Sequence, residues 1–256
     1  MLRYAVVRLP APTFAEGLTA AQLGAPVLEK ALEQHARYCE ALERSGLAVT
    51  RLDADARHPD STFVEDTAVL TPRGTILTRP GASTRVGEVA GVRPILEQLR
   101  GSVRAIGAPG TLDGGDVCET DQHYFIGISE RTNEEGARQL AAILAEDGYR
   151  TTCVDIRRIE GLLHLKSGIA YLGGRLLVAI EPLADLEAFQ EYRILLAERA
   201  ESYAANCVRV NRQVLFAVGF PRLEAALRRE GCALLPLEMS EFQKMDGGLS
   251  CLSLRF

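Results

Sequence analysis

Small or polar clusters, each followed by a short apolar run, recur five times along the chain. They lie at residues 65–70, 113–117, 164–171, 205–210 and 246–251. After each of the first four, a short turn leads to a second apolar run, at residues 75–77, 123–126, 175–178 and 213–216. Two short apolar runs joined by a turn predict a β-hairpin, and self-similarity at this period indicates a repeat architecture.

Helical patterns follow several of these hairpins. One begins near Thr132 and Glu135, which have the spacing of a capping box, and ends at Gly148. Another begins at Pro221, a residue favoured in the first helical turn, and ends at Gly231. A further apolar run closes each unit, at residues 103–106, 151–155 and 233–235. The repeating unit is therefore predicted to be strand, strand, helix, strand.

The last cluster lacks its partners, because the chain ends at Phe256. The missing pieces occur at the N-terminus: a strand at residues 4–7, a helical stripe of Leu28, Leu32, His35, Cys39 and Leu42, and a strand at residues 47–49. We expect the N-terminal segment to complete the fifth unit. The predicted fold class is α/β, a five-bladed α/β propeller of pseudo-symmetric ββαβ modules, in one catalytic domain over residues 1–256.

Such a ring places all five clusters around one central cavity. The chemically active side chains of the clusters are Glu65, Asp66, Asp113, Asp116, His164, Asp246 and Cys251. We therefore expect one site, built from residues that are far apart in the chain.

Composition narrows the function classes. A formal net charge of −5 and a pI near 5.5 argue against nucleic acid as a partner, because binding to a phosphate backbone needs a basic face. No apolar run approaches the roughly 18 residues of a membrane span, and no signal-peptide pattern follows Met1, so we expect a cytoplasmic protein without membrane contact. The six cysteines show no C-x-x-C spacing, which favours free thiols and predicts no structural metal.

Three cluster residues have the types of a nucleophile, a base and its orienting carboxylate: Cys251, His164 and Asp113. Taken singly, each has an ordinary structural explanation. A free cysteine usually fills a core, a histidine is usually a satisfied structural imidazole, and Asp-Gly-Gly-Asp is usually a turn. Their shared position in the repeat outweighs those explanations.

Glu65 and Asp66 suggest the substrate class. A guanidinium carbon is resonance-stabilised, so attack on it needs a strong, soft nucleophile such as a thiolate together with carboxylates that hold the cation. A carboxylate matches the planar fork of guanidinium N–H donors through paired hydrogen bonds.

The motifs around these residues resemble those of dimethylarginine dimethylaminohydrolases over nearly the whole chain. The segments that carry the resemblance are 63–68, 78–82, 110–117, 129–133, 163–168 and 245–251. That family belongs to the guanidine-modifying superfamily with the pentein fold, which is the five-bladed α/β propeller.

The resemblance implies a role for each matching residue. Cys251 would be the nucleophile, His164 the acid and base, and Asp113 the carboxylate partner of His164. On the substrate side, Glu65 and Asp66 would face the guanidinium, Arg85 and Arg131 the α-carboxylate, and Asp60 with the backbone of Leu18 the α-amino group; Met245 would line the same site. The resemblance also implies a small-molecule substrate, a homodimer, and no metal or cofactor.

The implied reaction converts an N-methylated arginine to citrulline and a methylamine through a covalent cysteine thiouronium. Three alternatives stay open at this stage. An arginine or agmatine deiminase would have the same nucleophile, but such enzymes usually carry an acidic residue two positions after the histidine, where this chain has Lys166. An amidinotransferase would pass the thiouronium to an amine, and a non-catalytic binding protein on the same ring would lack the cysteine, histidine and acid.

Overall fold

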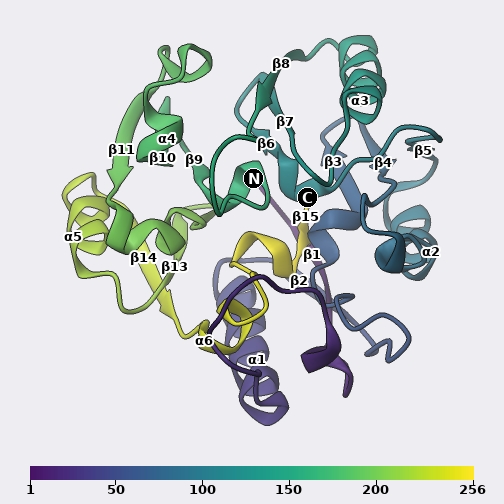
Figure 1. Cartoon of the computed structure of the whole chain (residues 1–256), viewed down its shortest axis with the longest axis horizontal. Coiled ribbons are helices and arrows are strands. Elements are labelled where there is room, and N and C mark those ends of the chain that lie inside the picture. The colour runs from purple at the N-terminus through teal and green to yellow at the C-terminus, as the bar shows by residue number, and fades with distance from the viewer.

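The computed structural model describes residues 1–256 and contains five three-stranded sheets arranged around one axis (Figure 1). In every sheet the middle strand pairs antiparallel with the first strand and parallel with the third. The parallel step needs a crossover, which helices provide on the outside of the ring. The prediction of a five-bladed α/β propeller is confirmed.

Four blades are continuous in the chain. The first has β3 (Ala68–Thr71), β4 (Gly74–Leu77), α2 (Glu88–Arg100) and β5 (Val103–Ala105). The second has β6 (Val117–Glu119), β7 (His123–Ile128), α3 (Glu134–Glu146) and β8 (Arg150–Asp155). The third has β9 (Ile169–Gly173), β10 (Leu176–Ile180), α4 (Glu181–Ala184) and β11 (Arg193–Ala197). The fourth has β12 (Val208–Val210), β13 (Gln213–Ala217), α5 (Pro221–Arg229) and β14 (Ala233–Leu237).

The fifth blade joins the two ends of the chain, as the repeat predicts. It consists of β15 (Leu254–Arg255), β1 (Tyr4–Arg8), α1 (Leu28–Arg44) and β2 (Ala48–Leu52), with α6 (Ser240–Gln243) ahead of β15. Ala5 pairs with Arg255 antiparallel and with Val49 parallel. The N-terminal strand is therefore the middle strand of a sheet that the C-terminus begins.

Helix α1 faces the core along one stripe. Its buried residues include Ala31, His35, Tyr38 and Leu42, at the spacing that one face of an α-helix requires. Leu32, which the pattern placed in this stripe, is exposed. At this turn the buried stripe is therefore shifted by one residue from the predicted stripe. Ala31 takes the place of Leu32, and Tyr38 also packs against the core.

The predicted capping box before α3 is wrong by one residue. The N-cap is Asn133, whose side-chain oxygen accepts a hydrogen bond from the amide of Gly136 at 2.8 Å. The hydroxyl of Thr132 instead donates to Asp116. Glu135 pairs with Arg138 on the surface of the helix.

Short 3₁₀ helices precede the inner strands and bring the five clusters to the axis. They are η2 (Val64–Thr67), η4 (Gly114–Asp116), η5 (Leu165–Ser167), η7 (Arg199–Ala205) and η8 (Ser250–Leu252). Helix η2 contacts both η4 and η8, and η4 contacts η5. Turns from three blades and the C-terminus thus meet side by side.

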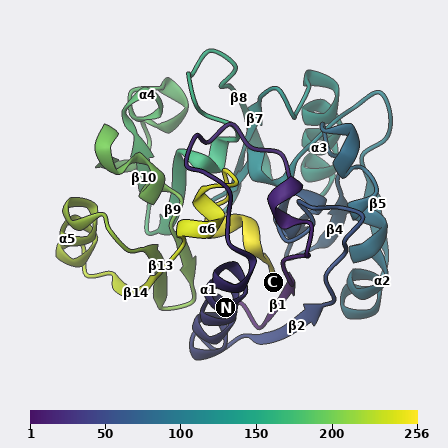
Figure 2. The same ribbon diagram turned by 60° about the horizontal axis from the view of Figure 1, so that its bottom comes forward.

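The segment between β1 and α1 crosses the end of the axis and lies beside α6 (dark purple and yellow in Figure 2). Phe14 of this segment packs against Phe63 and Phe242, with ring centroids 6.0 and 5.6 Å away. No helix in the chain has the length and apolar character needed to cross a membrane.

Candidate active site

Four of the 3₁₀ turns carry the candidate catalytic residues. Asp66 lies in η2, Asp113 immediately precedes η4, His164 immediately precedes η5, and Cys251 lies in η8. Asp113 and His164 both have extended backbone at the point where the chain enters the turn. Each side chain is therefore fixed by a rigid turn of a different blade.

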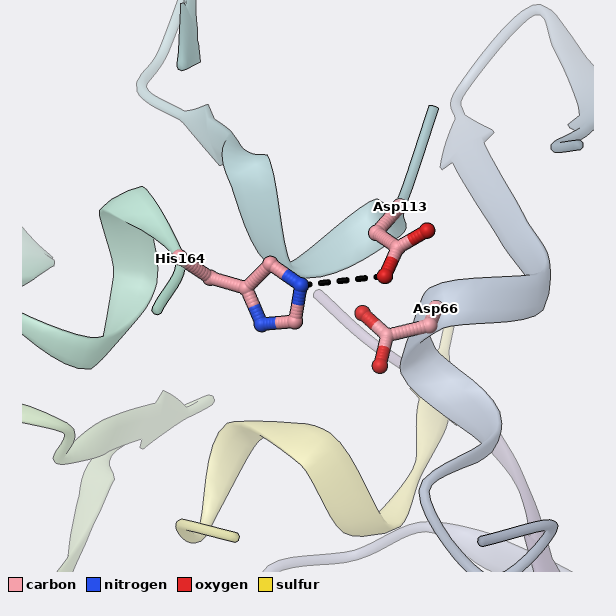
Figure 3. A group of neighbouring side chains, drawn as sticks. All are labelled: Asp66, Asp113 and His164. Atoms are coloured by element: carbon pink, nitrogen blue, oxygen red, sulfur yellow. Dashed lines mark hydrogen bonds and ion pairs between the residues drawn. The ribbon is translucent and has the colours of Figure 1, made fainter. Parts of the chain in front are cut away.

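His164 and Asp113 form a direct pair (Figure 3). The Nε2 atom of His164 lies 3.0 Å from Oδ2 of Asp113, and both side chains are buried. The other oxygen of Asp113 accepts a hydrogen bond from the amide of Gly81 at 2.9 Å. This arrangement leaves Nδ1 as the imidazole atom available for proton transfer.

Asp66 lies next to Asp113 and faces the same side of the His164 ring, as Figure 3 shows. Its Oδ1 accepts a hydrogen bond from the amide of Gly115 at 2.8 Å, and its Oδ2 pairs with Arg85 at 2.6 Å. Burial opposes ionisation of Asp66, but the charges of His164 and Arg85 outweigh it and lower the pKa to about 2. A stable carboxylate in this position suits a cationic ligand.

The pKa values of His164 and Cys251 indicate an imidazolium beside a neutral thiol, not a preformed thiolate–imidazolium pair. Burial favours neutral His164, yet the carboxylates of Asp66, Asp116 and Asp113 outweigh burial and raise its pKa to about 9. Burial, with the nearby charges of Glu65 and Asp66, raises the pKa of Cys251 to about 12. At neutral pH the unliganded site therefore holds an imidazolium and a neutral thiol.

A small cavity of about 30 Å³ brings most of the predicted residues together. Its lining includes Leu18, Asp60, Asp66, Arg85, Arg131, His164, Met245 and Cys251. Asp113 lies behind His164. The cavity is also lined by Phe63, Leu163, Asp246 and Gly247. Of these four residues, only Asp246 was predicted from the repeat. The other three were missed, although each lies within two positions of a predicted residue, and that closeness in sequence was the signal that could have found them.

The two arginines of the pocket differ in how they are held. Arg85 donates to Asp66, to Glu88 at 2.8 Å and to the carbonyl of Phe63 at 3.1 Å. The guanidinium of Arg131 makes no hydrogen bond or ion pair with another side chain. Arg131 is thus the cation that is free to bind an anionic group, while Arg85 anchors Asp66.

Asp60 and Asp246 hold the segment that covers the pocket. Both oxygens of Asp60 accept the amide of Leu18, at 3.0 and 3.2 Å. Asp246 accepts the amide of Ala20 at 2.5 Å and the hydroxyl of Thr19 at 3.2 Å. The cover is therefore fastened to the pocket wall by two carboxylates.

Among the predicted substrate-binding residues, Glu65 is the one whose side chain does not line this cavity. Its Oε1 lies 2.7 Å from Nζ of Lys166 and 3.3 Å from Arg255, and its Oε2 accepts the hydroxyl of Ser250 at 2.7 Å. These residues line a separate cavity of about 210 Å³. A hydrogen bond from Ser250, the neighbour of Cys251, links Glu65 to the turn that carries Cys251.

Asp66, Asp113 and His164 lie close enough together to ligate a metal ion. However, each of the four carboxylate oxygens already has a partner: Gly115, Arg85, Gly81 or His164 itself. The donors are satisfied within the protein, which fits acid–base chemistry better than metal binding.

Known proteins resemble this chain over its full length. An N(G),N(G)-dimethylarginine dimethylaminohydrolase from Pseudomonas aeruginosa is 42% identical over 257 residues that cover all of both chains. A second, from Streptomyces coelicolor, is 34% identical and covers 98% of this chain and 96% of its own. The structure of a cysteine-to-serine mutant of the Pseudomonas aeruginosa protein, complexed with citrulline, matches with a TM-score of 0.97 over all of both chains.

The chain belongs to the dimethylarginine dimethylaminohydrolase family. Residues 57–180 also match the family model described as arginine deiminase. The N-terminal domain of ArgZ, an arginine dihydrolase from cyanobacteria, matches with a TM-score of 0.89 at 18% identity, which shows a shared fold. Dimethylarginine dimethylaminohydrolases and these more distant proteins therefore share the pentein ring.

Proposed function

We propose that this protein hydrolyses N-methylated L-arginine to citrulline and a methylamine, with Cys251 as nucleophile. The observation that carries the proposal is the convergence of Cys251, His164 and Asp66 on one pocket, with His164 bonded to Asp113. Family membership supports the same reaction, since the relatives are named for it. The structure of a dimethylarginine dimethylaminohydrolase adduct with S-methyl-L-thiocitrulline, at 42% identity to this chain, supports a covalent route.

Substrate binding generates the nucleophile. The raised pKa of Cys251 has burial as its main cause and two carboxylates as its next causes. A bound guanidinium places a positive charge beside the sulfur and neutralises Asp66, so it lowers the pKa of the thiol. The thiol then loses its proton to solvent, and the thiolate attacks the guanidinium carbon.

His164 handles the remaining protons. As an imidazolium it donates a proton to the departing amine nitrogen, the C–N bond breaks, and a thiouronium remains on Cys251. The neutral imidazole then accepts a proton from water, and the hydroxide adds to the same carbon. Collapse of this adduct breaks the C–S bond, the hydroxyl proton passes to the departing sulfur, and citrulline is released with the thiol restored.

The other pocket residues hold the amino-acid end of the substrate. Arg131, with Arg85 beside it, binds the α-carboxylate, because Arg131 has no protein partner. Asp60 and the backbone of Leu18 receive the α-amino group, and Met245 packs against the aliphatic chain. Asp66 holds the guanidinium.

A substrate panel tests the proposal. Purified protein is incubated separately with asymmetric dimethylarginine, monomethylarginine, arginine and agmatine, while citrulline and released amine are measured. We expect citrulline and a methylamine from the methylated substrates, and no turnover by a Cys251→Ser variant. Turnover of arginine alone would instead support a deiminase, and amidine transfer to an added amine would support an amidinotransferase.

A binding experiment tests activation of the thiol by substrate. Ultraviolet absorbance of the thiolate is followed against pH, with and without a cationic amidine analogue, in the parent and in Cys251→Ala. We expect the analogue to lower the thiol pKa and the alanine variant to lack the signal. An unchanged titration would contradict activation by a bound cation.

We further propose that residues 1–256 act as one catalytic domain in the cytoplasm and assemble as a homodimer. Sedimentation velocity measures the assembly, and a monomer at micromolar concentration would overturn that part.

A further inference from the structure

Asp116 is a buried carboxylate outside the catalytic pocket. Its exposed fraction is 0%, it lies at the end of η4, and its side chain is not part of the pocket lining. The sequence placed it among the cavity residues because it belongs to a cluster. Its contacts indicate a role other than lining the pocket.

Three hydrogen bonds converge on Asp116, all with the carboxylate as acceptor. The amide of Leu165 donates to Oδ1 at 2.9 Å, and the hydroxyls of Ser129 and Thr132 both donate to Oδ2 at 2.6 Å. A protonated carboxyl would need to donate one of its own bonds, so this pattern fits the ionised form. A charge buried in this way is stabilised by hydrogen-bond donors rather than by water.

The contacts of Asp116 lead to both members of the His164–Asp113 pair. Leu165 follows His164 directly, so its amide fixes the turn that carries the imidazole. The hydroxyl of Thr132 donates to Asp116 and accepts the amide of Asp113 at 3.1 Å. One carboxylate therefore holds the backbone on each side of the acid–base pair.

The same carboxylate orders the turn before α3. The hydroxyl of Ser129 accepts the amides of Arg131 and Thr132, each at 3.0 Å, so its single proton is directed at Asp116. Arg131 lines the pocket. The segment that presents this arginine thus shares its anchor with His164 and Asp113.

We propose that Asp116 is a positioning residue that holds His164 against Asp113 and places a carboxylate near the imidazole. This rests on the proposed hydrolase function for its kinetic consequences only. The geometry of the pair and the protonation of His164 are measurable without substrate.

The charges around His164 agree with this role. The acidic groups acting on it are Asp66 from η2 and Asp113 and Asp116 on either side of η4. Arg85 binds Asp66, and the same pocket also presents Arg131, Asp60, Asp246 and Cys251. Burial lowers the pKa of His164, the three carboxylates together raise it to about 9, and Asp116 does so without touching the ring.

The principal test replaces Asp116 by Asn. Asp116→Asn retains an oxygen that can accept the amide of Leu165. It also places an NH₂ group against the hydroxyls of Ser129 and Thr132, which donate hydrogen bonds to the carboxylate in the parent protein. We expect kcat to fall by about tenfold or more, as for a misaligned acid–base group, with a smaller change in KM. We also expect the pKa of His164 to fall by about one unit, measured by NMR of histidine-labelled protein and assigned with His164→Gln.

Two further variants separate charge from position. Thr132→Val keeps the charge of Asp116 but removes the link to Asp113, so kcat should fall while the pKa of His164 stays within about half a unit of the parent. Thr132→Val also tests the positioning role of Asp116 if Asp116→Asn fails to fold. Glu201→Gln is the matched control, because Glu201 is a buried carboxylate outside the pocket lining that accepts the amides of Arg222 and Leu223 at the start of α5.

The outcomes are distinct. The proposal would be overturned if Asp116→Asn lost as much stability as Glu201→Gln and left the titration of His164 unchanged. Asp116 would then have only a structural role. An unchanged kcat in Thr132→Val would overturn the positioning role. A parent protein that turns over no methylated arginine would contradict the proposed function, while the NMR titration would still decide the role of Asp116.

Discussion

Glu65 and Asp66 are neighbours in one 3₁₀ turn, yet they serve opposite ends of the central axis. Asp66 lines the pocket with Cys251 and His164, whereas Glu65 lines the far cavity with Lys166. Successive residues of a 3₁₀ helix point about 120° apart, so adjacent side chains on such a turn diverge. The comparison teaches that a shared motif does not imply a shared site.

The two ends also differ in how their charge is balanced. Glu65 faces two cations, Lys166 and Arg255, and is neutralised within the protein. Asp66 shares Arg85 with Glu88, so its surroundings retain excess negative charge. A cationic substrate is therefore attracted to the end that holds Asp66.

The sharpest way to break this comparison is Asp66→Asn. It removes the carboxylate that we propose faces the guanidinium, and it deprives buried Arg85 of one partner. We expect kcat/KM to fall by about 10³-fold or more, since losing one member of a buried pair costs about 3–5 kcal/mol. Steady-state kinetics with dimethylarginine measure the loss. A decrease of less than tenfold would show that Asp66 does not hold the substrate.

The pH dependence of stability tests the excess charge at the catalytic end. The folded pKa of His164, about 9, lies above the ordinary value of 6.5 that the unfolded chain should have. Its stabilising contribution is therefore complete below pH 6.5 and is lost as pH rises through 9, with an upper limit of about 3 kcal/mol. Thermal unfolding should show a falling Tm over this interval, by about 2–4 °C per kcal/mol lost.

His164→Gln is the control for that titration. This variant has no imidazole at the site, so we expect its Tm to vary less with pH between 6.5 and 9 than that of the parent. Equal slopes in the two proteins would contradict the raised pKa of His164.

Two adjacent glycines provide a smaller and more local contrast. A Cβ atom on Gly115 would lie 2.8 Å from Oδ1 of Asp66 and 2.9 Å from Nδ1 of His164. On Gly114 it would lie 2.0 Å from the backbone oxygen of Glu65. Gly115→Ala should therefore displace catalytic side chains and lower kcat/KM by about 100-fold, since small misplacements at an active site cost that much.

Gly114→Ala should mainly lower stability, because backbone has to move. Its Tm should lie below that of Gly115→Ala in the same buffer. The reverse order, with Gly114→Ala the more stable and the less active variant, would contradict this assignment of the two glycines.

These contrasts show what the sequence can predict. Paired apolar runs and five clusters determine the blades, and the missing partners of the last cluster identify β1 as its middle strand. Local pattern does not determine which way a side chain leaves a 3₁₀ turn, so the placement of Glu65 could not be predicted. The Lys166–Glu65 pair joins residues 101 positions apart, which no local spacing indicates.

The cap of α3 shows the same limit. Thr132 and Asn133 are both good N-cap residues, and the sequence alone favours neither strongly. Buried Asp116 accepts a hydrogen bond from the hydroxyl of Thr132 at 2.6 Å, so Asn133 caps the helix instead. A tertiary contact thus decided between two local possibilities.

The smallest expected effect comes from the far end of the axis. Glu65→Gln removes the charge that Lys166 and Arg255 share but retains a group that can bond to Ser250, the neighbour of Cys251. We expect kcat to fall by about tenfold, which corresponds to about 1.4 kcal/mol, with KM nearly unchanged because Glu65 lies outside the pocket.

Lys166→Met completes this test, because Arg255 still pairs with Glu65 in that variant. If Glu65 acts only by supporting the nucleophile turn, Lys166→Met should reduce kcat less than Glu65→Gln does, and both should retain the KM of the parent. A large rise in KM for Glu65→Gln would instead mean that Glu65 contacts the substrate, and the division of the axis into two ends would then have to be abandoned.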